Sequence, residues 1–215
     1  MVKEKNNYQL YQYEEKFWNK NLSVCGIDEV GRGCLAGPIV TCAAIIHKNQ
    51  YHPKLADSKK LTKKTMLEVY EWLTSNCTYS IGINSSRIID QKNIYQTTKL
   101  TMKQALMHLQ KPGVQTPSII LIDAMLIDMS NTLYENIKQV SLIKGESKSA
   151  SIAAASVIAK VTRDTILQRL DTSFPSYNLK QHKGYGTKQH QESILSGQPS
   201  ILHRNTYLKN LLSKE

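Results

Sequence analysis

The clearest pattern in this chain is a series of short apolar runs separated by turn residues. Continuous apolar runs bounded by Gly, Pro or polar residues are typical of buried β-strands. The runs predict strands over residues 24–27, 39–47, 79–83, 119–122 and 139–143. The second run follows the turn signal of Gly37 and Pro38, and the fourth is wholly apolar, as in a strand that is buried on both faces.

Between and after these runs, apolar residues recur at the spacing of a helix face. The spacing predicts helices over residues 8–20, 62–74, 85–109 and 149–170, and a last helix that starts at Thr187. Thr62 is a suitable N-cap for the second of them. The order of elements predicts a layered α/β domain. We expect a helical extension peripheral to the chemistry over 1–20, this domain over 21–172, and a C-terminal helical segment contributing to the substrate site over 173–215.

Two adjacent carboxylates, Asp28 and Glu29, directly follow the first predicted strand and precede Gly31, Arg32 and Gly33. A carboxylate in a core strand is costly to desolvate unless a partner compensates it, and a divalent cation does so well. The glycines allow close approach of a backbone or a ligand. Because side chains alternate along a strand, both acids reach one ion only if the chain bends or the strand ends there.

Two further acids have a similar character. Asp123 ends the fourth predicted strand, and open α/β sheets bind ligands at such strand ends. Asp164 falls on the stripe of the Ala-rich helix that should face the sheet. A plain salt bridge with Lys160 or Arg163 is an alternative explanation for Asp164. If the four acids converge, they would suit a pair of hard cations, Mg²⁺ or Mn²⁺. Two such ions can activate a water and stabilise the leaving oxygen of a phosphodiester.

The net charge indicates a polyanionic partner. Lys and Arg number 28 against 17 Asp and Glu, which gives a formal net charge of +11. Such a surplus favours nucleic acid, because each neutralised phosphate releases counterions, although a basic protein without this partner would have the same charge. The polar N-terminus and the lack of a bilayer-length apolar run predict a cytoplasmic protein without a membrane partner. The four cysteines lack zinc-site spacing and are expected to be buried thiols.

Several segments in order, from about residue 23 to residue 207, resemble bacterial ribonuclease HII (type 2 ribonuclease H). They are GIDEVGRGCLAGP at 26–38, LADSKKLT at 55–62, LIDAM at 121–125, KGESKSASIAAASVIAKVTRD at 144–164, HKGYGTKQH at 182–190 and HRNTY at 203–207. Together they are far more specific than any one motif. The resemblance implies a ribonuclease H-like α/β fold with a mixed central sheet, flanking helices and a helical C-terminal segment.

The resemblance also implies an activity and a site. The implied enzyme hydrolyses the RNA strand of RNA–DNA hybrids and cuts 5′ of single ribonucleotides in duplex DNA, with two Mn²⁺ or Mg²⁺ ions. The implied metal-binding catalytic residues are Asp28, Glu29, Asp123 and Asp164. The implied ribonucleotide-sensing residues are Gly31, Arg32, Gly33 and Tyr185. Phosphate contacts are expected from a basic–hydroxyl cluster and a helix start, namely Ser58, Lys59, Lys60, Lys148 and Ser149.

Two alternatives remain open. Ribonuclease HIII would largely ignore a lone ribonucleotide, but it usually has an extra N-terminal domain, and about twenty residues before the first strand are too few for one. A non-catalytic nucleic-acid-binding protein explains the charge, yet it gains nothing from burying four carboxylates beside a polyanion. No carboxylate partner is evident for His182, His190 and His203, so we leave them out of catalysis. We expect a monomer.

Overall fold

The structure, a computed structural model, describes residues 8–110 and 112–213. At its centre is a five-stranded sheet in the order β3-β2-β1-β4-β5. The strands are β1 (Val24–Val30), β2 (Ile39–Ile46), β3 (Cys77–Asn84), β4 (Ile119–Asp123) and β5 (Gln139–Leu142). β2 pairs antiparallel with β1 and β3, whereas β4 pairs parallel with β1 and β5. The sheet is therefore mixed, as the resemblance implies.

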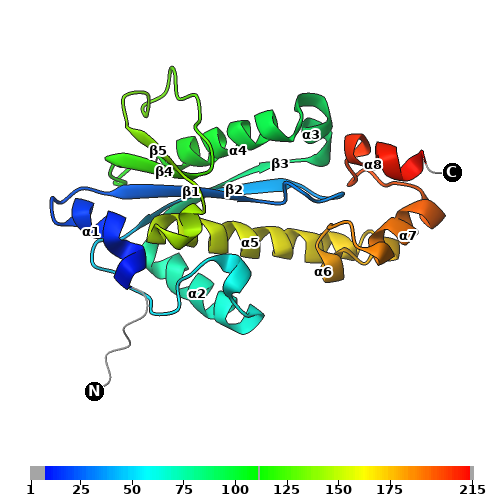
Figure 1. The fold of residues 1–215 in the computed structure, drawn as a ribbon, viewed down its shortest axis with the longest axis horizontal. Coiled ribbons are helices and arrows are strands. Elements are labelled where there is room, and N and C mark those ends of the chain that lie inside the picture. Colours follow the sequence, from blue (N-terminus) through cyan, green and yellow to red (C-terminus); the bar gives the residue numbers. More distant parts are fainter. Residues whose placement is uncertain (1–7, 111, 214–215) are drawn as a thin grey trace.

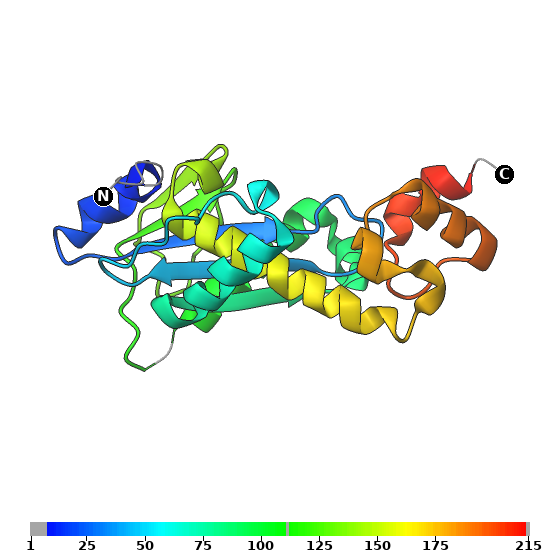
Figure 2. The ribbon, with the colours of Figure 1, turned by 90° about the horizontal axis from the view of Figure 1, so that it is seen from below.

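Helices cover both faces of the sheet (Figure 1). One face carries α2 (Lys63–Asn76) and α5 (Ala150–Asp171), and the other carries α3 (Ser86–Lys92) and α4 (Ile94–Leu109). α1 (Gln12–Trp18) lies at one end of the molecule, and α6 (Leu179–His182), α7 (Lys188–Gly197) and α8 (Asn205–Leu212) lie at the other (Figure 2). Short 3₁₀ turns span Tyr8–Tyr11, Ser58–Lys60, Gly145–Ser147 and Pro175–Tyr177.

The sheet is buried between two apolar layers. Every residue of β2 is buried. On one face, Val69 of α2 and Ala154 of α5 belong to one apolar cluster with β2. On the other face, Met102 and Leu106 of α4 pack into a second cluster with β1 and β4. Removal of this apolar surface from water stabilises the layered arrangement.

α5 lies directly against β1 and runs in the same direction. A Cβ added to Gly26 would lie 2.1 Å from the backbone carbon of Ser151, and one added to Gly31 would lie 2.4 Å from Nε of Arg163. The strand from Gly26 to Gly31 and the helix from Ser151 to Arg163 span about 16 Å and about 18 Å at their usual rises. The two elements are therefore matched in length along this contact.

The predicted elements are present, with three differences. β1 continues to Val30, because Asp28 and Glu29 also pair with β2. The helix predicted over 85–109 is two helices, which are separated at Asn93, a residue with φ of 62° whose side chain caps α4. The C-terminal segment contains α6 and α8 in addition to the predicted α7.

Two local predictions are confirmed. Thr62 caps α2 by accepting a hydrogen bond from the backbone N–H of Thr65 at 3.2 Å. The four cysteines are buried free thiols. Across the described ranges, no helix is long and apolar enough to cross a bilayer.

Candidate active site

Three acidic side chains meet at one edge of the sheet. Asp28 and Glu29 are in β1, and Asp123 is the last residue of β4. The parallel register pairs Ile27 with Ile122, so Asp123 lies level with Asp28 on the neighbouring strand. The negative charge of Asp123 acts on both other acids. The structure thus places three of the four predicted metal ligands on neighbouring strands, within electrostatic reach of one another.

The two adjacent acids of β1 have different partners. Asp28 is 7% exposed and accepts hydrogen bonds from the backbone N–H of Glu29 at 2.8 Å and from the Ser156 hydroxyl of α5. One oxygen of Glu29 lies 3.4 Å from Nη1 of Arg32. Neither a strand end nor a departure from pairing separates the two acids, because β1 remains paired with β2 through Val30. β1 therefore does not end at the two acids.

The site disfavours simultaneous negative charges on these acids. Burial, followed by the charges of Glu29 and Asp123, raises the pKa of Asp28 well above its usual value. Burial also raises the pKa of Glu29, with Arg32 opposing the rise and Asp123 adding to it. A cation bound here would offset both the desolvation and the repulsion.

A further acid, Glu146, lies beside this group and was missed by the sequence analysis. It is 7% exposed, and its Oε1 lies 3.7 Å from Nζ of Lys59. Its turn contacts Asp123, because the backbone N–H of Gly145 donates to Asp123 Oδ1 at 2.8 Å. The turn follows β5, which is parallel to β4, so the residues after both strands reach the same edge. The sequence could have indicated Glu146, because residues that follow a predicted parallel strand are expected at the same end of the sheet as Asp123.

We call the group of Asp28, Glu29, Asp123 and Glu146 the acidic edge. Lys59 is a cation that faces it. Partial burial lowers its pKa, but four carboxylates outweigh that effect and raise it overall, namely Glu146, Asp57, Asp28 and Asp123. The Lys59 side chain is 81% exposed. Its ammonium group is therefore accessible to a phosphate while it compensates the acids.

The structure does not bring Asp164 to this group. Its carboxylate accepts a hydrogen bond from Nζ of Lys160 at 2.7 Å, which is the salt bridge of the alternative explanation. Asp164 lies two turns beyond Ser156, about 12 Å along α5, and its charge acts on Lys183 and Tyr185. Within the described part of the chain, no three His, Cys, Asp or Glu side chains form a ready-made metal site.

The Gly-Arg-Gly turn after β1 is supported by a buried arginine. Arg204 donates to the carbonyls of Gly31 at 2.6 Å, Arg32 at 2.8 Å and Gly37 at 3.0 Å. In a trans peptide the carbonyl and the N–H that follows it point in opposite directions. The N–H groups of Arg32 and Gly33 are therefore directed away from Arg204. Both residues are exposed, so these two amide donors belong to a turn at the surface.

A second buried arginine, Arg163, joins the segment after this turn to the loop of Tyr185. It donates to the carbonyl of Ala36 at 3.0 Å and to that of Lys183 at 2.8 Å. Tyr185 is 43% exposed, and its hydroxyl contacts the buried Cys34 of the turn. The predicted tyrosine and the predicted turn thus lie side by side.

Comparison with known proteins agrees with this geometry. A family model described as Ribonuclease HII matches residues 25–209. The chain belongs to the ribonuclease HII family. Ribonuclease HII of Macrococcus caseolyticus is 42% identical, over 96% of this chain and 75% of the relative. That of Alkaliphilus metalliredigens is 41% identical, over 94% of this chain and 98% of the relative. The protein is therefore a ribonuclease H enzyme.

Solved structures confirm the predicted ribonuclease H-like fold. Ribonuclease H2 from Pyrococcus horikoshii OT3 matches with a TM-score of 0.75 and 23% identity, over 90% of this chain and 98% of that one. Bst-RNase HIII in complex with Mn²⁺ matches with a TM-score of 0.65 and 21% identity, over 90% of this chain and 70% of that one. At these identities the likeness concerns the fold alone.

The phosphate contacts expected for this ribonuclease HII family member fall into two groups. The exposed ones are Lys59, Lys60 and Lys148. The two serines are buried, and the Ser58 hydroxyl shares a hydrogen bond with Ser156 at 2.9 Å. Ser149 is fully buried, and its hydroxyl donates to Glu14 of α1 at 2.7 Å. The structure therefore gives the Ser149 hydroxyl an internal acceptor instead of a surface that a phosphate could reach.

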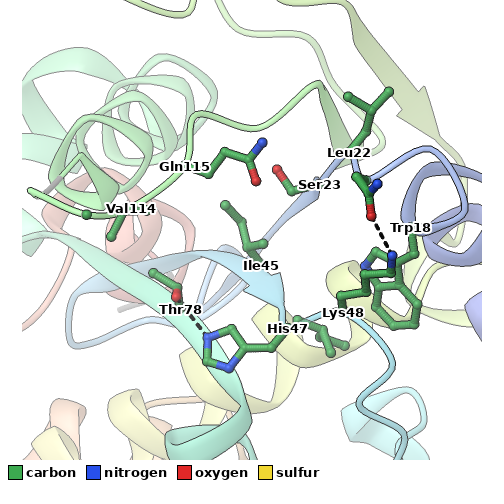
Figure 3. A pocket seen from close by; sticks show the side chains of 12 residues that line it. Trp18, Leu22, Ser23, Ile45, His47, Lys48, Thr78, Val114 and Gln115 are labelled. Atoms are coloured by element: carbon green, nitrogen blue, oxygen red, sulfur yellow. Dashed lines mark hydrogen bonds between the residues drawn. The ribbon is translucent and has the colours of Figure 1, made fainter.

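A cavity of about 480 Å³ lies away from the acidic edge. Figure 3 shows side chains that line it. The cavity is at the opposite end of β1, where that strand begins and β2 ends. Its walls include Trp18, Ser23, His47, Lys48 and Gln115. None of the predicted site residues lines it.

Proposed function

We propose that the protein is an endonuclease that hydrolyses the RNA strand of RNA–DNA hybrids and cuts 5′ of single ribonucleotides in duplex DNA. The supporting observation concerns one stretch of backbone. β1 carries Asp28 and Glu29, and the turn after β1 carries the amide N–H groups of Arg32 and Gly33, which are directed away from Arg204. Asp28 and Glu29 would face the phosphodiester to be cut, and Arg32 and Gly33 would face the neighbouring ribose. The protein would act as a monomer.

The acidic edge fits hard divalent cations, Mn²⁺ or Mg²⁺, which prefer carboxylate oxygens. Within the described residues, one buried oxygen of Glu29 and one of Glu146 lack a hydrogen-bond partner, so each has free capacity to bind a cation. A pair of bound ions would activate a water and stabilise the leaving oxygen, giving a 5′-phosphate product. Ser156 would orient the carboxylate of Asp28.

We propose Glu146 as the fourth ligand in preference to Asp164. The turn of Glu146 contacts Asp123, and within the described residues the ion-pair partner of its carboxylate is Lys59, at 3.7 Å. Asp164 already has a close ion pair with Lys160. A ligand that must bind a metal is better left without a strong competing cation.

Recognition of the ribonucleotide would depend on the turn and the tyrosine. The amide N–H groups of Arg32 and Gly33 would donate to the 2′-oxygen, which DNA lacks. The exposed ring of Tyr185 would pack on the sugar at the junction with the following deoxyribonucleotide. Exposed lysines such as Lys59 would contact phosphates and attract the duplex.

The test uses one duplex with a single embedded ribonucleotide and one with a continuous RNA strand, each with Mn²⁺ or Mg²⁺. We expect incision 5′ of the lone ribonucleotide, cutting of the hybrid, and no cutting of an all-DNA duplex. Asp28→Asn should reduce both activities at least about 100-fold while duplex binding is retained, because the charge is lost and the shape is kept.

Each alternative predicts a different result. Cutting of the hybrid without incision at the lone ribonucleotide would assign the ribonuclease HIII activity. Binding of both duplexes without cutting, and without Mn²⁺ uptake in isothermal titration, would indicate a nucleic-acid-binding protein without catalysis.

A further inference from the structure

Three buried histidines lie behind the loop that carries Tyr185. His182 is in α6, His190 is in α7, and His203 precedes α8. The rings of His182 and His190 are stacked, with centroids 4.1 Å apart. The Nε2 atoms of His190 and His203 are 3.1 Å apart. The three rings therefore form one continuous cluster, and the catalytic proposal does not use it.

The hydrogen bonds of His190 and His203 define which nitrogens carry protons. His190 Nδ1 is 2.9 Å from the carbonyl oxygen of Tyr185, which can only accept, so Nδ1 carries the proton. Nε2 of the neutral His190 ring is then an acceptor, and His203 must donate to it through Nε2. His203 Nδ1 is left as an acceptor, and it receives the backbone N–H of Ser200 at 3.0 Å. This pattern is that of two neutral rings, and burial lowers the pKa of His190 to about 4 and also lowers that of His203.

His182 supports the same loop from the other side. Its Nε2 donates to the carbonyl of Tyr177 at 2.6 Å, and its Nδ1 accepts the backbone N–H of Gly184 at 3.2 Å. Its own carbonyl accepts the N–H of Tyr185 at 3.0 Å. The N–H of Tyr185 is therefore held by the His182 carbonyl, and the Tyr185 carbonyl accepts from both the His190 ring and the backbone N–H of Thr187, the latter at 2.8 Å.

The loop needs this support because glycines flank Tyr185 on both sides. Gly184 has φ of 76°, and a Cβ there would lie 2.3 Å from the carbonyl oxygen of Ala36, so this position requires glycine. Glycine leaves the free loop many conformations. The carbonyl of Gly184 accepts the N–H of Leu35 at 2.8 Å, which fixes the loop to the segment after the Gly-Arg-Gly turn.

We propose that His190 is a positioning residue for Tyr185, and that His203 fixes His190 in the tautomer that donates to the Tyr185 carbonyl. The role rests on the proposed function, because it concerns the residue that would pack on the ribose. His190 does not touch substrate. It acts by fixing the backbone from which the Tyr185 ring projects.

Paired variants separate the two nitrogens. Asn places an amide near Nδ1 of the histidine it replaces, and Gln places one near Nε2. His190→Asn keeps the donor to Tyr185 and should retain kcat/KM on the single-ribonucleotide duplex within about 3-fold, whereas His190→Gln should lose roughly tenfold. The order reverses at His203, where Gln should be tolerated and Asn should not.

A double-mutant cycle tests whether His190 acts through Tyr185. His190→Gln in a Tyr185→Ala background should cost less than about 2-fold in kcat/KM, because the ring to be positioned is gone. Thermal unfolding of each variant shows which ones are folded at the assay temperature. If one His190 variant unfolds, the His203 pair gives the same comparison. Equal losses for Asn and Gln, or full additivity with Tyr185→Ala, would overturn the positioning role. A wild-type protein that cuts neither duplex would instead refute the proposed function.

Discussion

At the scale of residues, the acidic edge depends on which carboxylates share one electrostatic environment. Asp28, Glu29 and Asp123 act on one another, and Lys59 is influenced by Glu146 together with Asp28 and Asp123. These influences connect residues from β1, β4 and the turn after β5. The fold therefore brings these charges together from segments that are far apart in the sequence.

This environment predicts how metal binding responds to two substitutions. Glu146→Gln should weaken Mn²⁺ binding, measured by isothermal titration, at least about tenfold, because one anionic oxygen donor is lost. Asp164→Asn should change Mn²⁺ affinity by less than about 2-fold, because its carboxylate is paired with Lys160. The reverse order of effects would return the fourth ligand to Asp164. Thermal unfolding of both variants checks that the fold is intact.

The sequence pattern predicted that Asp28, Glu29 and Asp123 belong together. It did not predict how far along α5 Asp164 lies. Helical periodicity defines the face on which a residue lies, and it does not define its level along the facing strand. Asp164 is on α5 but two turns beyond Ser156, beside Lys160 and the Tyr185 loop. Glu146 lies in a turn, where periodicity gives no information. Long-range contacts such as Ser149 to Glu14 are equally invisible to local patterns.

At the scale of elements, α1 is part of the support of α5. Glu14 of α1 is fully buried and accepts hydrogen bonds from the Ser149 hydroxyl at 2.7 Å and the Ser151 N–H at 2.9 Å. These donors lie at the N-terminus of α5, where an anion is stabilised by free N–H groups and the helix dipole. The predicted peripheral helix therefore contacts the element that carries Ser156.

Glu14 variants should change stability with a defined dependence on pH. Glu14→Ala leaves two buried donors without an acceptor and should lower the free energy of unfolding by about 1–3 kcal/mol. Burial raises the pKa of Glu14, opposed in part by Ser149, so the folded state binds more protons than the unfolded state between the two pKa values. Wild-type stability therefore falls as pH rises through the raised pKa.

Glu14→Gln lacks this titration, so it should become more stable relative to wild type as pH rises. Denaturant unfolding across pH measures the difference. Glu71→Ala on the exposed side of α2 is a matched control with little expected effect. A pH-independent difference between Glu14→Gln and wild type would contradict the raised pKa.

The order of elements was more predictable than their boundaries. The sequence pattern identified all five strands, most clearly β2 and β4, in which continuous burial requires continuous apolar sequence. The break at Asn93 was missed, since α3 and α4 have the same apolar period on both sides of it. The extension of β1 to Val30 was missed because polar residues there pair with β2 through backbone groups alone.

At the scale of the whole molecule, positive charge outweighs negative charge by +11. Arg163 and Arg204 add to this field from inside the fold, because their guanidinium groups donate to backbone carbonyls instead of carboxylates. Their charge lies beneath the Gly-Arg-Gly turn and the Tyr185 loop. The side of the molecule that would receive a duplex therefore holds two buried positive charges.

Duplex binding should accordingly depend strongly on salt. For Asp28→Asn, which binds without cutting, affinity should fall by roughly 1,000-fold between about 50 and 200 mM salt. Lys59→Ala in that background should reduce the slope of log affinity against log salt by about one, because one phosphate contact is removed. Lys48→Ala, at the far cavity, should leave the slope unchanged. Fluorescence anisotropy measures both, and equal slopes for the two lysine variants would contradict the placement of the duplex.

The close contact of β1 with α5 has a consequence for where a strand is cut. One continuous stretch of backbone carries the acids and, a few residues later, the amides proposed to meet the ribose, and the helix behind it prevents that stretch from sliding. The distance between the acids that would act on the phosphodiester and the amides that would contact the sugar is thus fixed by the backbone. Because this distance is fixed, the enzyme would cut one bond next to each ribonucleotide without a conformational change.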